Sequence, residues 1–340
     1  MFALHYDGVV TAVGLVTLCF AAFIAIFKHD LKGLLAYSTL SHLGLIVCLL
    51  GIGSPLAVAA ALFHVLNHAT FKAALFMLAG VIDHQTGTRN LRKLGGLWTL
   101  LPWTATLSMV AAAAMGGIPL TNGFLSKEMF LTEVLTLTGG TWLLIVPLLA
   151  TLGALFGITY SIRFVHNTFF GGVASPRLPN KNIKEASLGL RSPIILLCIL
   201  CIAVGLLPAF FAQSIVQLGA GAVLNYTPVQ PVHLAIWHGF NMPLVMSLIA
   251  IIGGALLYMV LAKNQKIQHI HSEQWFGNYA GDDLFERVLV RCVASARKLI
   301  STLENGSLQR YLVFIITATL VMAIVPLWGE QLRTGSRLLN

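Results

Sequence analysis

Long apolar runs separated by short polar segments are the dominant pattern of the chain. About 20 apolar residues in a helix cross the hydrocarbon core of a bilayer, so each run of that length predicts a membrane-spanning helix. Eight runs occur, at residues 9–27, 34–53, 56–82, 101–120, 121–166, 193–211, 241–262 and 309–328. The pattern therefore predicts an all-α fold, a polytopic membrane helix bundle.

The fifth run is too long for one straight span. Gly139 and Gly140 lie in its middle, and the sequence Gly116-Gly117-Ile118-Pro119 interrupts the chain just before it. These breakers predict a discontinuous helix, two half-helices with an unwound joint at the glycine pair. Broken helices of this kind mark transport paths in membranes. A re-entrant loop without function is the alternative interpretation.

Composition and charge agree with the membrane prediction. Hydrophobic residues make up 57% of the chain and charged residues only 10%, with a mean hydropathy of +0.84. A soluble domain has about 25% charged residues. Alternate connections between the runs hold 17 of the 21 lysines and arginines, so we expect these basic loops to be cytoplasmic. No basic patch interleaved with aromatic residues occurs, and no nucleic-acid partner is expected.

Three ionisable residues lie four positions apart inside the third run: His64, His68 and Lys72. A four-residue step turns a helix by about 400° and rises about 6 Å, so the three side chains share one face. Each would cost about 2.5 to 3.5 kcal/mol if it faced hydrocarbon. Such a ladder points to proton or ion passage. A polar stitch between packed helices is the bland alternative.

Lys127 is the second intramembrane lysine, and it directly follows the Gly-Pro break. Unwound backbone and Ser126 are positioned to solvate its ammonium group. Glu128 is adjacent, but neighbouring helical residues point about 100° apart, so Glu133 or another helix is an equally good partner. The sequence leaves the partner of Lys127 open.

Cofactor, metal and enzyme chemistry receive no support. The histidine pair lacks the glutamate of a His-Glu-x-x-His zinc motif, and the Cys198–Cys201 spacing lies in an apolar span without polar neighbours. Five cysteines, odd in number, predict no disulfide framework. No glycine-rich phosphate loop follows a strand. We therefore expect no metal, no cofactor and no catalytic site.

Residues 283–305 carry apolar side chains on one face and basic ones elsewhere, which predicts an amphipathic helix at the membrane surface. A soluble capping helix is the alternative. The expected organisation is a membrane bundle over residues 1–266, a cytoplasmic loop with this amphipathic helix over 267–306, and a final span with a tail over 307–340.

Three segments resemble the antiporter-like subunits shared by complex I and Mrp-type cation/proton antiporters, and they occur in the order of that family. They are DLKGLLAYSTLSHLGL at 30–45, FHVLNHATFKAALFMLAG at 63–80 and IPLTNGFLSKEMF at 118–130. The sequences IDHQTGTRNLRKLGGL at 82–97 and LENGSLQRYL at 303–312 look more like the A subunit of the Mrp-type sodium/proton antiporter. The resemblance implies a bundle of inverted repeats, of which this chain holds the second, with the first repeat missing.

The resemblance also implies a function. In the family, buried lysines and histidines relay protons, and the matching residues here are Lys32, His64, His68, Lys72 and Lys127. Supporting polar groups are expected from Ser38, Ser41, His42, Asn67, Ser126 and Glu128. Lys32 has a second interpretation, as a lysine that extends to the cytoplasmic surface.

The implied protein is a proton-conducting subunit of a multisubunit Na+/H+ antiporter in a bacterial plasma membrane, with other subunits, Na+, H+ and the lipid bilayer as partners. Two alternatives stay open. One is a proton-pumping subunit of a respiratory NADH-quinone oxidoreductase or a related redox complex. The other is a non-conducting structural fragment.

Overall fold

The structure is a computed structural model. It describes residues 2–137, 142–171, 178–224, 234, 239–263, 281–303, 309, 311–313, 315–320 and 322. The chain divides into two compact units, Met1–Ser272 and Glu273–Asn340. Each unit is described by itself.

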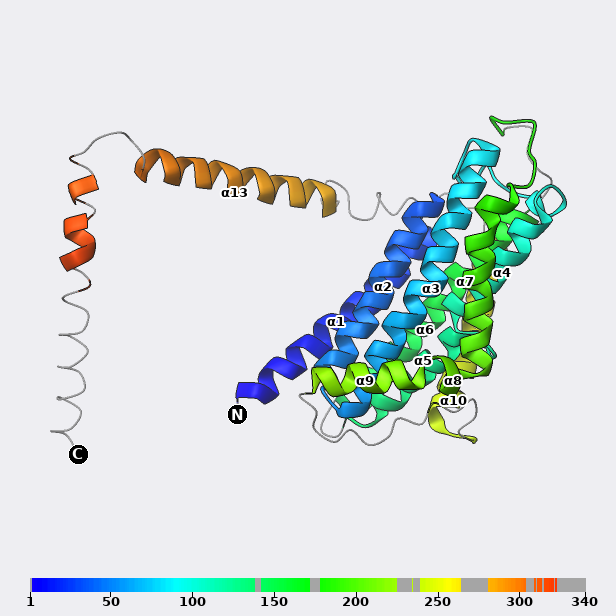
Figure 1. Cartoon of the computed structure of the whole chain (residues 1–340), viewed down its shortest axis with the longest axis horizontal. Helices are drawn as coiled ribbons and strands as arrows, with labels where there is room; N and C mark the ends of the chain where they lie inside the picture. The colour runs from blue at the N-terminus through cyan, green and yellow to red at the C-terminus, as the bar shows by residue number, and fades with distance from the viewer. Residues whose placement is uncertain are drawn as a thin grey trace. The chain divides into compact units, whose positions relative to one another are not determined.

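The first unit is a helix bundle (Figure 1). Its helices are α1 (Phe2–Phe27), α2 (Leu31–Ile52), α3 (Pro55–Thr86), α4 (Pro102–Gly116), α5 (Asn122–Leu135), α6 (Trp142–Val165), α7 (Leu188–Leu206), α8 (Pro208–Phe211), α9 (Gln213–Val223) and α10 (Met242–Lys263). Two short elements, the 3₁₀ turn η1 (Leu97–Thr99) and the π-helix η2 (His166–Phe170), complete it. The described residues contain no strand, only an isolated bridge between Asp30 and Asn90. The all-α prediction is confirmed.

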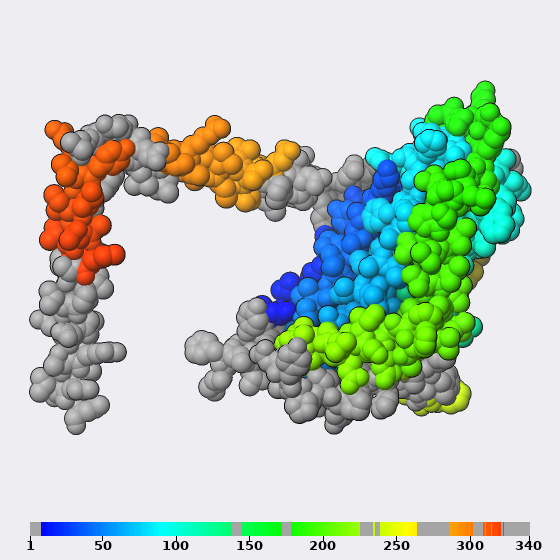
Figure 2. All heavy atoms as spheres, in the orientation of Figure 1, coloured from blue at the N-terminus to red at the C-terminus, as the bar shows by residue number. Residues whose placement is uncertain are grey.

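Six helices are long and apolar enough to cross a membrane, namely α1, α2, α3, α7, α10 and the continuous segment of α6 and η2. The chain is therefore a multi-pass membrane protein. In Figure 2 the side chains of α7, in green, form an outer edge of the bundle, and apolar Leu196, Ile199 and Ile202 are exposed on it. Exposed apolar side chains on a membrane helix face lipid or a neighbouring subunit.

The structure corrects the prediction for the fourth and fifth runs. Helices α4 and α5 have 15 and 14 residues, which at about 1.5 Å per residue is too short for a hydrocarbon core about 30 Å thick. The half-length pair is thus α4 and α5, and the full span expected at 101–120 was wrong. Helix α6 is long enough to cross, so two half-helices within 121–166 were also wrong. The pair Gly139 and Gly140 lies outside the described residues.

Local backbone chemistry explains the break between α4 and α5. Gly117 adopts a left-handed conformation with φ of 79°, and its N–H bonds to the carbonyls of Ala113 and Ala114, which closes α4. Leu120 also has a positive φ, of 70°. Gly123 then packs directly on the Ala114 carbonyl oxygen, where a Cβ atom would clash. The glycines and the proline in this segment therefore end one helix and let the next begin close beside it.

The ends of α2 and α3 follow ordinary capping rules. Asp30 accepts a hydrogen bond from the Gly33 N–H at the start of α2, and Ser54 accepts one from the Ala57 N–H at the start of α3. Gly53 and Gly87 end the same two helices in the left-handed conformation. These short-range signals position the helices that carry the ladder residues.

Small residues bring α1 and α2 into close contact. Gly14 lies against the backbone of Cys48, and Gly44 lies against the backbone of Leu18. Glycine lets two membrane helices approach until their backbones touch, which increases their van der Waals contact. This packing fixes α2, the helix that carries Lys32, Ser38, Ser41 and His42.

The second unit contains α13 (Gly281–Leu303), so the helix expected over 283–305 exists. Its location along the membrane surface stays a prediction, as does the division of the chain at residues 266 and 306. The span expected at 309–328 lies mostly outside the described residues.

Candidate functional site

The ladder residue Lys72 lies between α2, α3 and α4 and is only 5% exposed. Its Nζ atom donates to the Leu35 carbonyl at 3.2 Å and to the Ser38 hydroxyl, and it contacts the Met115 sulfur at 3.4 Å. Ser38 in turn donates its proton to the Leu35 carbonyl. The amine is therefore surrounded by neutral acceptors, an environment in which it can gain or lose a proton without breaking an ion pair.

A hydrogen-bonded file of side chains crosses the centre of the bundle. The Tyr160 hydroxyl lies 3.2 Å from His42 Nε2, His42 Nδ1 lies 3.0 Å from His64 Nε2, and His64 Nδ1 lies 2.9 Å from the Ser126 hydroxyl. These residues come from α6, α2, α3 and α5. We call this row, Tyr160, His42, His64 and Ser126, the central file.

One assignment of protons satisfies every contact in the central file. Ser126 donates to the Gly123 carbonyl, so it accepts from Nδ1–H of His64. Nε2 of His64 is then an acceptor for Nδ1–H of His42, and Nε2 of His42 accepts the Tyr160 hydroxyl proton. All donors point in one direction along the file. Such an arrangement permits a proton to enter at one end while another leaves at the other.

His68 lies beside the central file and not within it. Its ring is 5.3 Å from that of His42 and 6.3 Å from that of His64. Its Nε2 atom is buried and makes no hydrogen bond with the described residues. The vertical ladder of the sequence is thus interrupted, because His42 from α2 is the direct neighbour of His64.

Lys127 borders the other side of the file and is 8% exposed. Its Nζ atom donates to the carbonyls of Met115 at 2.9 Å and Gly116 at 2.7 Å, the last residues of α4. The break after Gly116 leaves these carbonyls without helical partners, and a helix C-terminus carries partial negative charge. The partner of Lys127 is therefore this helix end. Glu133 instead accepts a hydrogen bond from Ser54 at 2.5 Å.

A cavity of about 10 Å³ separates Lys127 from the central file, and a single water needs about 10 to 15 Å³. Ser41, His42 and Tyr160 share its lining with Lys127. Ser41 also donates to the Leu18 carbonyl at 3.0 Å, which ties α2 to α1. The cavity places one water-sized space between the lysine and the histidine file.

Asn67 fixes the position of the broken segment. Its amide donates to the Asn122 carbonyl at 3.1 Å, and the Asn122 amide donates to the Thr70 hydroxyl at 2.9 Å. This pair of bonds joins α3 to the first residue of α5, four residues before Ser126. Glu128, the remaining supporting residue, is 5% exposed on α5.

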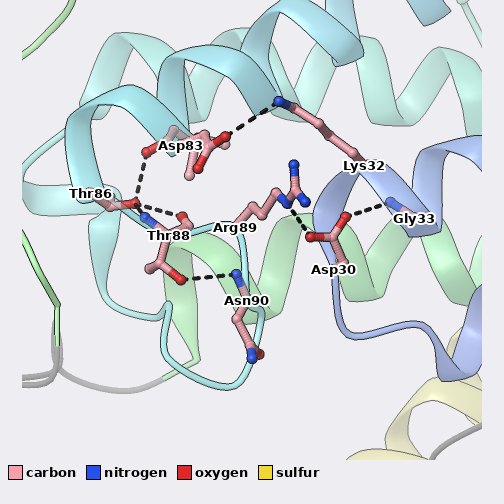
Figure 3. A network of polar contacts seen from close by, with 9 residues as sticks. Asp30, Lys32, Gly33, Asp83, Thr86, Thr88, Arg89 and Asn90 are labelled. Carbon is pink, nitrogen blue, oxygen red and sulfur yellow. Dashed lines mark hydrogen bonds and ion pairs between the residues drawn. The ribbon is translucent and has the colours of Figure 1, made fainter.

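Lys32 does not join the buried group. It forms an ion pair with Asp83 at 3.3 Å, and its side chain is 42% exposed. Figure 3 shows this pair beside a second one between Arg89 and Asp30, at the end of the bundle where α2 begins and α3 ends. Lys32 precedes Ser38 by six residues, or about 9 Å along a helix axis.

Sequence reasoning did not find Tyr160 or the backbone carbonyls that hold Lys127. Tyr160 is 118 residues from its partner His42, and no spacing rule connects them. The α4 carbonyls acquire their role only because the helix ends at Gly116, which the apolar run through residue 120 conceals.

A multi-pass helix bundle with a broken helix beside buried lysines and histidines defines an antiporter-like membrane subunit. Residues 2–156 match the family model described as NADH:quinone oxidoreductase/Mrp antiporter, transmembrane. The chain belongs to this family, and within it the chain is similar to the A subunit of Mrp antiporters. This homology indicates a transport protein rather than an enzyme.

Three related proteins illustrate the similarity. The A/B subunit of a probable K+/H+ antiporter of Rhizobium meliloti is 46% identical over 91% of this chain and 31% of its own length. The A1 subunit of a Na+/H+ antiporter of Staphylococcus saprophyticus is 36% identical over 94% of this chain and 41% of its own length. A chain in the Mrp complex from Dietzia sp. superposes with a TM-score of 0.74 at 30% identity, over 95% of this chain and 34% of that one. The chain therefore spans between a third and two fifths of the relatives it matches.

Proposed function

We propose that this chain forms the proton-conducting part of a subunit in a cation/proton antiporter. The observation that carries the proposal is the central file of Tyr160, His42, His64 and Ser126, hydrogen-bonded at 2.9 to 3.2 Å across four helices. A buried row with aligned donors provides a route that hydrocarbon otherwise denies to protons.

Two lysines flank this route in the proposal. Lys72 loads and releases protons on the side of the basic loops, and His68, one helical turn away, transfers them to His42 and His64. Lys127 takes them up across the water-sized cavity that it shares with His42. Lys32, near the start of α2, supplies the entrance. Changes in charge at these groups act electrostatically on cation movement in neighbouring subunits.

The cation and the surroundings are also proposals. The relatives are named for Na+ or K+ exchange, and we propose Na+ as the coupled cation. The partners are then the other subunits of a hetero-oligomeric antiporter. Its location is a bacterial plasma membrane with the basic loops in the cytoplasm, because the basic residues of α2, the α3–α4 connection and α6 gather at one end of the bundle.

The variant Lys72→Ala tests the relay. The chain is assembled with its antiporter subunits in inside-out vesicles, and the initial rate of proton efflux on adding Na+ or K+ is measured. We expect a loss of at least about tenfold, which corresponds to about 1.4 kcal/mol in the barrier, because the amine that carries the proton is gone.

Lys93→Ala is the matched control, since Lys93 is an exposed lysine in a basic connection and its removal should leave the rate unchanged. Co-purification of the other subunits verifies that each variant assembles. Normal cation-driven flux in assembled Lys72→Ala would refute the relay and favour the structural alternative. Co-purification with flavin and iron-sulfur subunits would favour the redox-complex alternative.

A further inference from the structure

A second and much larger cavity opens at the basic end of the bundle, away from the central file. Its volume is about 570 Å³. Its walls come from the last residues of α1, from the connection that holds Leu91 and Arg92, from the junction of α6 with η2, and from the end of α10. Four elements distant in sequence thus enclose a space of the size that small ligands occupy, which is about 300 to 1,000 Å³.

The polar part of the lining is basic. Arg92, Arg163, His29 and His166 all contribute to it, and none of the described residues that line it carries a carboxylate. The ion pairs of Asp30 and Asp83 belong to Arg89 and Lys32, which are not in the lining. The cavity therefore has a net positive charge and is suited to an anion.

His29 lies between the two guanidinium groups. Arg163 Nη2 is 2.9 Å from its Nδ1 atom, and Arg92 Nη2 is 2.9 Å from its Nε2 atom. A neutral imidazole has one acceptor nitrogen and one N–H group. Only one arginine can therefore donate to it, and the other directs an N–H at a nitrogen that already carries a proton. An anionic oxygen beside the two guanidinium groups would accept that proton and remove the conflict.

Arg163 is held rigidly for such a task. Its Nη1 atom donates to the carbonyls of Ile26 and Lys28 at the end of α1. Tyr258 stiffens the opposite wall, because its hydroxyl donates to Asn167 at 2.8 Å and contacts His166 Nδ1 at 2.8 Å. The site is thus assembled before a ligand arrives, which lowers the entropic cost of binding.

We propose that this cavity binds a phosphate-bearing ligand, with the phosphate between Arg92 and Arg163. The planar guanidinium fork matches phosphate oxygens in pairs. The rest of the lining is apolar, with Phe27, Leu94 and Leu261, so it fits the glycerol and upper acyl carbons of an anionic phospholipid. Basic pockets between membrane helices on the cytoplasmic side take such headgroups. Free phosphate is the other source of the same chemistry.

The test measures lipid binding to the full purified chain. Dioleoyl-phosphatidylglycerol is titrated in detergent, and native mass spectrometry gives the Kd of the first bound lipid. We expect Arg92→Gln to weaken it at least about tenfold. Lys93→Gln, the same change of charge at the next residue outside the cavity, should alter it less than about twofold, and binding of dioleoyl-phosphatidylcholine should be equal in all forms.

A second variant keeps both arginines. Ala262→Trp places a large side chain on the wall formed by α10 and should exclude the lipid by volume alone. Inorganic phosphate, followed by ³¹P line broadening, separates the two sources. If phosphate binding depends on Arg92 and phosphatidylglycerol binding does not, the site is one for free phosphate. Equal weakening by Arg92→Gln and Lys93→Gln, or unchanged binding of both probes to Ala262→Trp, would overturn the proposal.

Discussion

Tyr160 sets the direction of the central file, because its hydroxyl is the first donor in the row. Tyr160→Phe would leave His42 Nε2 as a buried acceptor without a donor, which costs about 1 to 3 kcal/mol. We expect a lower melting temperature and a several-fold slower cation-driven proton flux, with assembly of the complex intact. Tyr37→Phe is the control, since the Tyr37 ring stacks under Lys28 and phenylalanine keeps that contact. Equal flux in the two variants would remove Tyr160 from the pathway.

The residues of the site were only partly predictable. Helical periodicity finds His64, His68 and Lys72, because three residues at a four-residue spacing share a face whatever surrounds them. It cannot show that His42 would separate His64 from His68, since that depends on the depth at which α2 packs on α3. Ser38 and Ser126 were expected as supporting groups, and each hydrogen-bonds to the ladder.

The two half-length helices give Lys127 its partners, and Gly117 joins them. Gly117→Ala would force an L residue to φ of 79° and place a Cβ atom 2.7 Å from Lys127 Cδ. Strain of this kind costs about 1 to 3 kcal/mol. We expect a matching loss of thermal stability and reduced flux, because the lysine must leave the α4 carbonyls.

Gly80→Ala is the control for this helix-end change. Gly80 is helical, and no atom lies within 4 Å of the position a Cβ would take. Alanine there should be neutral or stabilising by about 1 kcal/mol. If Gly117→Ala melted and transported like Gly80→Ala, the break would not position Lys127.

Elements were more predictable where chemistry is local. Asp30 and Ser54 cap their helices with side chains visible in the sequence, and Gly116 to Pro119 reads plainly as a break. The length of α4 was not predictable, because Ile118 and Leu120 continue the apolar run after the helix has ended. Hydropathy reports burial, and it does not report whether a buried residue is helical.

The whole molecule has one basic end, and its side of the membrane can be measured. In a variant without the exposed Cys292, we expect Lys93→Cys to react with a membrane-impermeant maleimide in inside-out vesicles alone. Ser214→Cys, on α9, which packs against the first turns of α3, should react in intact cells alone. Both are exposed positions. The reverse pattern would place the basic loops outside the cell and contradict the proposed orientation.

Aligned donors in the central file have a kinetic consequence. Once a proton has travelled from Tyr160 to Ser126, both imidazoles have exchanged tautomers, and every N–H points back toward its source. A second proton cannot follow until the rings regain their first tautomers. The row therefore behaves as a turnstile that must be reset after each passage, which suits stoichiometric exchange and opposes a continuous leak.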